Sequence, residues 1–395
     1  MAKDPVQVER ATDEVEIRTV ADLLSKSLFF SLADVNHWIE VEGRENFRAA
    51  RRNGQVIGGF TVQRMGQWFG GRCVPIGAIR AVGVAPEHRS AGVGAEMMRA
   101  AIRELHRDGV PLAVLFPATQ PVYRRAGFEV AGVRMGYRIA TRDLDVRDCG
   151  LTIRPGVAGD HAVIRELYTS VARVTPGNLD RNEWMWRRTL EPPPWLPPVS
   201  ISVVERDGRC EGYVVVSQKT GSPQENRLAI ADFATNSSDA LRRLLSFVAD
   251  HRSVAPEVRW FGGPCSASQL ALAEQRFVHF ERMDWMLRVV DVVAAFEQRG
   301  FPQGLTGQVH LEVRDDVVDA NNRRFQVEVS NGRAVVSEGG RGGLQVSIRG
   351  LAALFTGMFS PYELRNAGLL IGSEESLAAA SQVFSGPTPW MADSF

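Results

Sequence analysis

Apolar and polar positions follow two different periods along the first third of the chain. Runs rich in β-branched and apolar side chains predict strands at 55–62, 76–84 and 111–116. Between residues 95 and 107 apolar side chains recur at helical spacing, and Gly109 is placed to end that helix because glycine tolerates positive φ. The apolar face of this helix is made by Met98, Ala101, Ile102 and Leu105. The order strand, helix, strand predicts a parallel crossover in an α/β domain, preceded by helical stretches at 21–27 and 44–52.

The pattern partly repeats in the middle of the chain and changes near residue 291. The middle region predicts strands at 200–204, 212–217, 228–233 and 258–261, and a helix at 239–251. The last region predicts helices at 291–296, 350–358 and 373–383, and runs that alternate like antiparallel strands at 309–313, 324–329, 333–337 and 344–348. We interpret the chain as α/β domains at 1–150 and 151–290, followed by an α+β domain at 291–395.

Composition excludes several classes of protein. A chain of 395 residues is too long for one ordinary core, so two or three domains are expected. Forty-six basic residues balance 46 acidic ones, which gives no attraction to nucleic acid or to an anionic membrane. No apolar run approaches the roughly 20 residues of a membrane span, and the charged segment Met1–Pro5 is unlike a signal peptide. The four cysteines and seven histidines show no metal-ligand spacing, so no metal is expected. The cysteines are also far apart in the sequence, which is unlike a disulfide framework and fits a reducing cytoplasm.

The motif with the clearest chemistry lies between the second strand and the amphipathic helix. The strand ends at Val82, Gly83 and Val84, and a turn opened by Pro86 leads to Arg89-x-x-Gly92-x-Gly94. Glycines let a backbone approach a ligand closely, and a helix start offers unpaired N–H groups, so this segment predicts a pyrophosphate site. The predicted loop consists of Arg89, Ser90, Ala91, Gly92, Val93, Gly94 and Ala95. A plain glycine-rich turn is the alternative, while a P-loop and a dinucleotide fingerprint are excluded by the spacing.

A second motif follows the third strand. Tyr123 stands four residues before Gly127-Phe128. In isolation such a tyrosine is more often a core aromatic, but after the first motif we interpret it as functional.

Together these motifs resemble the GCN5-related N-acetyltransferase (GNAT) fold, whose R/Q-x-x-G-x-G/A segment binds the coenzyme A pyrophosphate. Val82 to Pro86, His88-Arg89, the Tyr123–Phe128 segment and a chain ending in Phe395 resemble the Eis (enhanced intracellular survival) family more specifically. This resemblance implies two tandem GNAT-type domains and a C-terminal sterol-carrier-protein-like domain, and it implies a homo-hexamer. It covers essentially the whole chain.

The resemblance also implies roles for individual residues. Val82, Gly83, Val84, the Arg89–Ala95 loop, Ala118 and Thr119 would border acetyl-CoA. Tyr123 would be the general acid and the main-chain carboxylate of Phe395 the general base. The acceptor pocket would involve Phe29, Phe30 and Trp38. The middle domain lacks R-x-x-G-x-G and carries an N-cap sequence at residues 235–239 instead, so we expect it not to bind coenzyme A.

The chemistry of acetyl transfer suits these residue types. A tyrosine with a pKa of about 10 can protonate a leaving thiolate, and a backbone N–H near Val82–Val84 can stabilise the oxyanion. A carboxylate with a pKa of about 3.5 is a poor base unless burial raises that pKa or water relays the proton. We therefore predict N-acetylation of a cationic primary amine on an aminoglycoside-like molecule, a polyamine or a lysine side chain. The alternative is a non-catalytic acyl-CoA sensor or lipid binder on a GNAT scaffold.

Overall fold

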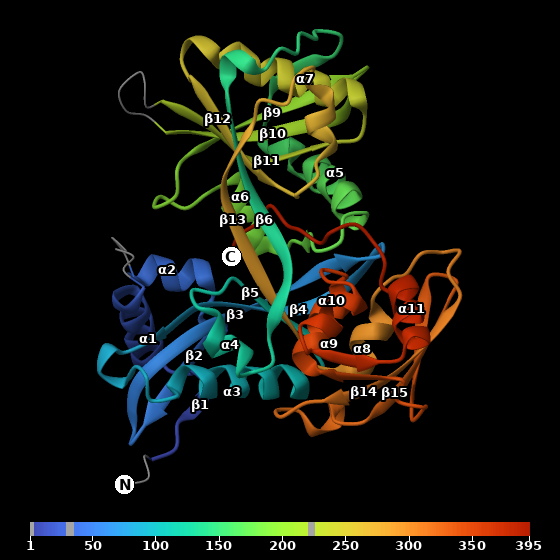
Figure 1. The fold of residues 1–395 in the computed structure, drawn as a ribbon. Helices are drawn as coiled ribbons and strands as arrows, with labels where there is room; N and C mark the ends of the chain where they lie inside the picture. Colours follow the sequence, from blue (N-terminus) through green and yellow to red (C-terminus); the bar gives the residue numbers. More distant parts are fainter. Residues whose placement is uncertain (1–3, 29–34, 220–225) are drawn as a thin grey trace. The chain divides into compact units, whose positions relative to one another are not determined.

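The computed structural model describes residues 4–28, 35–219 and 226–395 and divides the chain into two compact units. Unit 1 comprises Met1–Gly132, Asp284–Pro387 and Phe395, and unit 2 comprises Val133–Met283 and Thr388–Ser394. Two long strands, β6 (Glu129–Ala140) and β13 (Val278–Val289), run from one unit into the other (Figure 1). The first and last thirds of the sequence therefore belong to one unit. The segment Thr388–Ser394, just before Phe395, belongs with the middle third in unit 2.

The larger sheet of unit 1 has the strand order β1-β2-β3-β4-β5-β13. Its remaining strands are β1 (Gln7–Arg10), β2 (Phe47–Arg52), β3 (Gln55–Phe69), β4 (Arg72–Val84) and β5 (Leu112–Leu115). The β4–β5 pair is parallel and the other pairs are antiparallel. The predicted parallel crossover is therefore confirmed.

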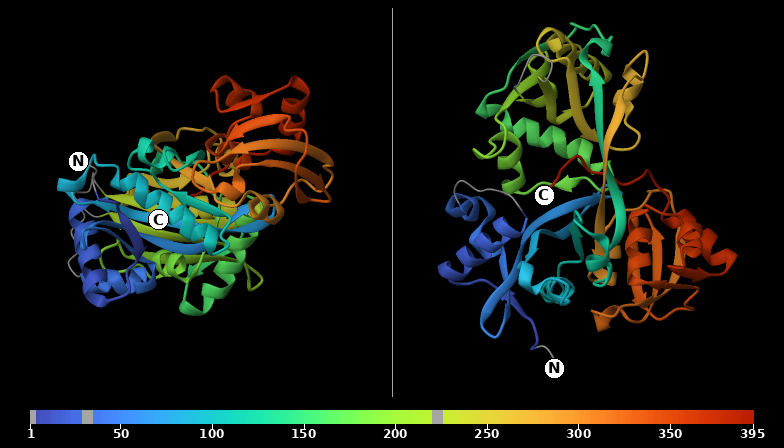
Figure 2. Two further views of the ribbon diagram at one scale, coloured as in Figure 1. Left: turned by 90° about the horizontal axis from the view of Figure 1, so that it is seen from below. Right: turned by 60° about the vertical axis from the view of Figure 1, so that its left-hand side comes forward.

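Helices cover both faces of this sheet. They are α1 (Glu14–Ser27), α2 (Val35–Glu42), α3 (Val93–Arg107) and α4 (Gln120–Arg124). Successive strand residues point to opposite faces, and a Cβ on Gly58 would meet Met97 of α3 while one on Gly59 would meet Val20 of α1. Helices α1 and α3 consequently lie on opposite faces, which Figure 2 shows with the sheet between them. All four apolar residues predicted for the inner face of α3 are buried.

The prediction of a helix at 44–52 is wrong. The segment is a single 3-10 turn, Arg44–Asn46, followed by strand β2. Strand β2 pairs with β1 on one side and β3 on the other, and its first four residues are buried. Pairing on both sides overrides the local helical preference of its Ala and Arg residues.

In unit 2 the strand order is β6-β12-β11-β10-β9-β7, with both parallel and antiparallel neighbours. Its other strands are β7 (Thr152–Pro155), β9 (Val199–Arg206), β10 (Arg209–Lys219), β11 (Arg227–Thr235) and β12 (Glu257–Gly262), and β8 (Leu179–Asp180) is a short additional strand. Its helices are α5 (His161–Arg173), α6 (Glu183–Leu190) and α7 (Ser238–Ala249). Strands β11 and β12 are parallel and flank α7 in sequence, so unit 2 repeats the crossover of unit 1.

The C-terminal part of unit 1 forms a separate sheet of order β16-β15-β14-β17-β18. Its strands are β14 (Gly307–Arg314), β15 (Arg324–Ser330), β16 (Arg333–Glu338), β17 (Leu344–Ser347) and β18 (Leu370–Gly372). Its helices are α8 (Val292–Gln298), α9 (Ile348–Thr356), α10 (Pro361–Asn366) and α11 (Glu374–Val383). The expectation that these strands are all antiparallel is wrong for β17, which pairs parallel to β14. Alternation alone does not encode strand direction, because the side-chain period is two in both kinds of ladder.

The hairpin between β3 and β4 packs backbone to backbone on the segment after α8. The Gly300 N–H donates to the Phe69 carbonyl over 2.9 Å. A Cβ on Gly300 would lie 1.9 Å from the carbonyl oxygen of Gly70. Because both partners are backbone, no side-chain rotation can relieve this steric clash. This contact joins the N-terminal and C-terminal domains within unit 1.

We predict that Gly300→Ala lowers the free energy of unfolding by about 3 kcal/mol, because overpacking against backbone forces both segments apart. Gly304→Ala is the matched control, since a Cβ there would meet no atom within 4 Å. Urea unfolding of the two variants measures the difference. Equal stability of Gly300→Ala and Gly304→Ala would contradict the close approach.

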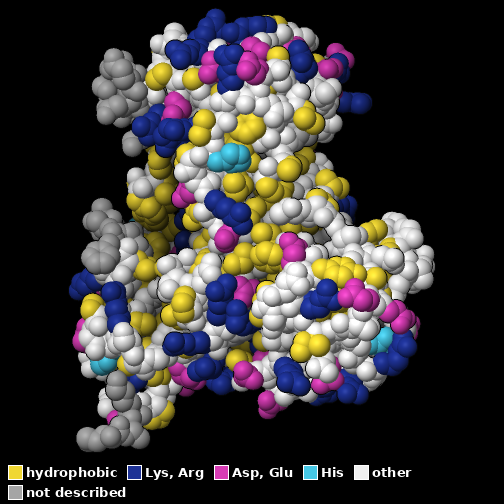
Figure 3. All heavy atoms as spheres, in the orientation of Figure 1, with side chains coloured by type: hydrophobic (Ala, Val, Ile, Leu, Met, Phe, Trp, Pro, Cys, Tyr) yellow, Lys and Arg dark blue, Asp and Glu magenta, His cyan; other side chains and the backbone are white. Residues whose placement is uncertain are grey.

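Basic and acidic side chains are interspersed over the face drawn in Figure 3, in keeping with 46 residues of each sign. Among the described residues, none of the helices combines the length and the apolar character that crossing a bilayer requires.

Candidate active site

The predicted coenzyme segment borders a cleft of about 460 Å³ in unit 1. Strands β4 and β5 pair only from Ile76 to Ala78 and from Leu112 to Val114, so the end of β4 is free of β5. The cleft is lined by Val82, Gly83, Val84, Arg89, Ser90, Gly92, Val93, Gly94, Ala95, Ala118, Thr119 and Tyr123. The structure thus brings together the predicted residues of both motifs, while Ala91 lies in the same loop and packs against the core behind it.

A β-bulge shapes the strand edge that faces this cleft. The β3–β4 register shifts between Gly59 and Thr61, and Ala81 on the opposing strand has a φ of 49°. Positive φ is costly for a residue with a Cβ, and such outliers concentrate at functional sites. The bulge interrupts the regular β3–β4 ladder just before Val82, at the end of β4 that does not pair with β5.

The bulge is held from α2 by a buried carboxylate. Glu42 accepts a hydrogen bond from the Thr61 hydroxyl over 2.8 Å and pairs with the guanidinium of Arg80, the residue before Ala81. The Glu42 side chain is only 1% exposed. Sequence reasoning missed this pair, because nothing in the local pattern of residues 35–42 points to β4.

The loop before α3 presents backbone N–H groups to the cleft. Ser90 and Gly92 both have positive φ, at 61° and 79°, and Gly92 caps α3 without a side-chain hydrogen bond. The first N–H groups of a helix have no intrahelical partner and attract anions. Arg89 is exposed, and its guanidinium donates to the carbonyls of Val84 and Ser27, each over 3.2 Å. Arg89 therefore braces the loop in addition to adding positive charge.

Five further residues line the cleft that the sequence analysis did not assign to the site. They are Ser27, Leu28, His88, Val122 and Arg125. His88 and Arg125 join Arg89 in making this cleft rich in basic groups, which suits a ligand with several phosphates. His88 lies in the first motif and Arg125 in the second, so their positions within these motifs could have indicated that they border the cleft.

Tyr123 projects from α4 into the cleft and is 6% exposed. Burial raises the pKa of Tyr123 to about 12. Its ring makes an edge contact with Phe128 at 6.2 Å between centroids. The hydroxyl therefore stays protonated well above neutral pH, although the same burial makes it a weaker acid than an exposed tyrosine.

The turn after Tyr123 is fixed by a fully buried ion pair. The Arg288 guanidinium on β13 donates to the Ala126 carbonyl over 3.0 Å and to both carboxylate oxygens of Asp315 over 2.7 Å. A Cβ on Gly127 would lie 2.5 Å from Arg288 Nε, so glycine is required there on steric grounds as well as by its φ of 88°. Arg288 and Asp315 therefore position the segment that carries Tyr123.

The other predicted residues are placed less directly. The Phe395 ring contacts the Phe116 ring, just beyond β5, at 5.5 Å between centroids. Trp38 is 6% exposed and packs edge-on against Phe47, and it is not among the residues found to line the cleft in the described chain. Phe29 and Phe30 lie outside the described residues. Within the described ranges no group of three or more His, Cys, Asp or Glu side chains is arranged to hold a metal ion.

Comparison with known proteins defines the class. Two models described as acetyltransferase (GNAT) domains match residues 8–131 and 177–289, and a sterol carrier protein domain model matches residues 292–392. The protein is therefore an acetyl-CoA-dependent N-acetyltransferase with two tandem GNAT domains and a sterol-carrier-type domain. This confirms the fold class and the enzyme class predicted from the sequence. The domain boundaries at 150 and 290 stay a prediction.

Individual relatives define the family. A GCN5-related N-acetyltransferase from Anabaena variabilis is 34% identical with a TM-score of 0.95, covering 99% of this chain and 100% of that chain. One from Kribbella flavida is 27% identical with a TM-score of 0.86, covering 100% and 99%. An uncharacterized N-acetyltransferase from Streptomyces griseus is 28% identical over 82% of this chain and 83% of its own. The chain belongs to the GCN5-related N-acetyltransferase family.

The resemblance to Eis proteins is also confirmed at the level of fold. Eis1 from Mycobacterium abscessus is 20% identical and has a TM-score of 0.82, covering 99% of this chain and 100% of that chain. The chain is thus Eis-like in its arrangement of two GNAT domains and a sterol-carrier-type domain.

Gly92 and Gly109 allow a matched test of the loop. Both have positive φ, both flank α3, and a Cβ on either would meet no atom within 4 Å. Each Gly→Ala change should cost about 1 kcal/mol of stability through backbone strain. We predict that Gly92→Ala also raises the Kd for acetyl-CoA about tenfold, because the strained loop moves its N–H groups, equivalent to about 1.4 kcal/mol. Calorimetric titration showing the same Kd for both variants would contradict the loop's role.

Proposed function

We propose that the protein transfers the acetyl group of acetyl-CoA to a primary amine of a cationic acceptor in the cleft of unit 1. Tyr123 acts as the general acid and the main-chain carboxylate of Phe395 as the general base. The observation that carries the proposal is a single basic cleft that combines the bulged end of β4, the side-chain-free N-cap of α3 and the buried hydroxyl of Tyr123.

The coenzyme fits the residues of this cleft. The open edge at Val82–Val84 offers backbone donors and acceptors to an extended chain containing amides, as a neighbouring strand would. The Arg89–Ala95 loop supplies N–H groups and positive charge for a pyrophosphate. Both elements enclose the same cleft, so one molecule can use them together.

The proposed reaction balances as a direct transfer. The neutral amine nitrogen forms a bond to the acetyl carbon, and the bond from that carbon to sulfur breaks. The leaving sulfur takes the proton of the Tyr123 hydroxyl, and the nitrogen releases a proton to the Phe395 carboxylate. A nitrogen bonded to the tetrahedral carbon is much more acidic than a free ammonium, which makes a weak base sufficient at that stage. Backbone N–H groups beside the bulge would stabilise the oxyanion.

The second GNAT domain is proposed not to bind coenzyme A. Its helix α7 is capped by Ser237, whose hydroxyl accepts from the Ala240 N–H over 3.2 Å and donates to the Glu211 carboxylate over 2.6 Å. Asp239 adds another acidic group in the first turn. A helix start that is already capped and surrounded by carboxylates is unsuited to a pyrophosphate.

The acceptor proposed here is an aminoglycoside-like molecule, a polyamine or a lysine-bearing peptide, which share a primary amine and positive charge. We further propose a homo-hexamer acting in the cytoplasm, in line with the Eis-like arrangement. Light scattering of the purified protein measures the assembly, and a monomer would contradict it.

Thiol release from acetyl-CoA with a panel of these amines tests the function. Amine-dependent release that is saturable in both substrates supports the transferase. Binding of acetyl-CoA without turnover on any amine would favour a non-catalytic sensor of acyl-CoA. A variant with Arg89→Ala serves as the control for the cleft and should bind acetyl-CoA more weakly.

A further inference from the structure

The second GNAT domain contains a split between two parallel strands, like the one that forms the coenzyme cleft. Strands β11 and β12 pair only from Arg227 to Ile230 and from Glu257 to Trp260. Beyond the pairing, Ala231–Thr235 and Phe261–Gly262 line a cavity of about 210 Å³. Trp390 and Ala392 line the same cavity. The protein's own C-terminal segment therefore lies where the first domain has its coenzyme cleft.

Hydrogen bonds to its backbone tie the segment 388–394, here called the tail, to the rest of unit 2. The tail pairs with β6 through a parallel bridge between Val133 and Trp390. Further bonds join Trp390 N to Pro176 O at 3.0 Å, Met391 N to Val133 O at 3.2 Å, Asn178 Nδ2 to Trp390 O at 2.9 Å and Arg134 Nε to Ala392 O at 2.7 Å. Met391 is fully buried, and a Cβ on Gly263 would lie 2.5 Å from the Trp390 indole nitrogen. The tail is thus an integral strand-like element of this domain.

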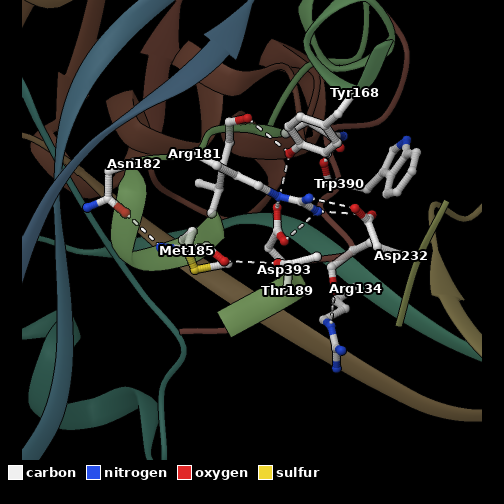
Figure 4. Close-up of polar contacts among 12 residues, drawn as sticks. Arg134, Tyr168, Arg181, Asn182, Met185, Thr189, Asp232, Trp390 and Asp393 are labelled. Carbon is white, nitrogen blue, oxygen red and sulfur yellow. Dashed lines mark hydrogen bonds and ion pairs between the residues drawn. The ribbon is translucent and has the colours of Figure 1, made fainter. Parts of the chain in front are cut away.

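A charged socket receives the tail at Asp393 (Figure 4). Arg181 is held by the two carboxylate oxygens of Asp232, at 2.6 and 3.0 Å, and Asp232 accepts from the Tyr213 hydroxyl at 2.6 Å. The other side of the guanidinium binds Asp393, with Nε to Oδ2 at 3.1 Å and Nη2 to Oδ1 at 2.8 Å. Tyr168 completes the socket.

Tyr168 contributes both a face and a hydroxyl. The Arg181 guanidinium carbon lies 3.7 Å from the centre of the Tyr168 ring. The Tyr168 hydroxyl has two acceptors for its one proton, Asp393 Oδ2 at 3.1 Å and the Leu179 carbonyl at 3.0 Å. Burial raises the pKa of the Tyr168 and Tyr213 hydroxyls well above 10, so both remain donors. The side chains of Arg181, Asp232 and Asp393 are 2%, 5% and 6% exposed.

Such a socket fixes register in a way that apolar packing does not. A bidentate guanidinium–carboxylate pair has one geometry, whereas apolar contacts tolerate sliding. Arg181 is already paired with Asp232, so the socket is complete within the body of the domain and Asp393 is the part that arrives with the tail. Phe395 follows Asp393 by two residues, so the Cα atom of Phe395 lies within about 7 Å of the Cα atom of Asp393.

We propose that Arg181 is a positioning residue for acetyl transfer, and that its buried pair with Asp393 holds the tail in the register that presents the Phe395 carboxylate. This inference rests on the proposed function, in which that carboxylate is the base. The split between β11 and β12, unused for coenzyme, serves as the docking groove of the tail. The second GNAT domain thereby contributes to catalysis through the position of residue 395.

The test compares Asp393→Ala with wild type by three measurements. Carboxypeptidase Y should release Phe395 at least about tenfold faster from the variant, kcat should fall at least about tenfold, and the Kd for acetyl-CoA should stay within about twofold. Arg181 keeps Asp232 as a counter-charge, so the domain should remain folded. Tyr168→Phe, which removes one hydroxyl from the anchor, should shift release and kcat in the same direction by a smaller factor.

Controls separate the anchor from the base. Glu183→Gln alters an exposed ion pair with Arg165 in the same domain and should leave all three measurements unchanged. Deletion of Phe395 alone should lower kcat. Suppose that Asp393→Ala releases Phe395 at the wild-type rate and keeps the wild-type kcat, while deletion of Phe395 abolishes activity. This result would contradict the anchoring role of Asp393 but would still support the Phe395 carboxylate as the base. Unchanged kcat on deleting Phe395 would overturn the base and, with it, the positioning role.

Discussion

Tyr123→Phe is expected to lower kcat by about 10² to 10⁴ while leaving the Kd for acetyl-CoA nearly unchanged, because only the proton donor is removed. The ring stays, and with it the edge contact to Phe128 that helps to shape the cleft. Steady-state kinetics with a responsive amine and calorimetric titration of acetyl-CoA separate the two quantities.

Tyr362→Phe is the matched control for Tyr123→Phe. Tyr362 lies on α10 in the C-terminal domain and is not found among the described residues that line the cleft. Its substitution should leave both kcat and Kd unchanged. Wild-type kcat in Tyr123→Phe would remove this hydroxyl from the mechanism.

The raised pKa of Tyr123 has a predictable effect on the pH profile. A phenol with a pKa of about 12 remains protonated up to a pH at which an ordinary tyrosine, with a pKa near 10, is half ionised. Because the folded state holds this proton more tightly, the associated stability is present below about pH 10 and is lost as the pH rises through about 12. We expect no fall in kcat between about pH 8 and pH 10 from loss of the acid. A decline near pH 10 that disappears in Tyr123→Phe would contradict the buried, high-pKa acid.

Blocking the carboxylate of Phe395 should have the second large effect. A short Gly-Ser extension after Phe395 converts the carboxylate into an amide and should lower kcat about a hundredfold, the lower end of the range for a general base. The same extension at the N-terminus is the control and should have no effect. The rates of thiol release from the two tagged forms decide the matter, and full activity with the C-terminal extension would contradict the role of the carboxylate.

The fold of the segment proposed to bind the coenzyme was predictable because its signals are local. Strand β4, the loop and α3 follow one another within about 35 residues, and each has its own pattern of apolar positions or glycines. The amphipathic helix predicted from residue 95 begins at Val93, two residues earlier, and Gly109 ends it with a φ of 69°.

The detailed geometry around the proposed site was not predictable in the same way. Ala81 carries no sequence signal for its positive φ, since alanine is common in both strands and helices. Strand β2 was mistaken for a helix because pairing with β1 and β3, not local preference, decides its structure. Arg181 and Asp393 are 212 residues apart, and only tertiary folding brings them together.

We propose above all that this cleft transfers the acetyl group of acetyl-CoA to an amine. A single-turnover experiment tests it most directly, with protein in excess over acetyl-CoA, a polyamine such as spermidine as acceptor, and chemical quench at a series of times. We predict that N-acetylated amine and free coenzyme A appear together, in equal amounts and at the same rate, and that Tyr123→Phe slows both. Bound acetyl-CoA that persists unchanged, or free coenzyme A without acetylated amine, would contradict the account.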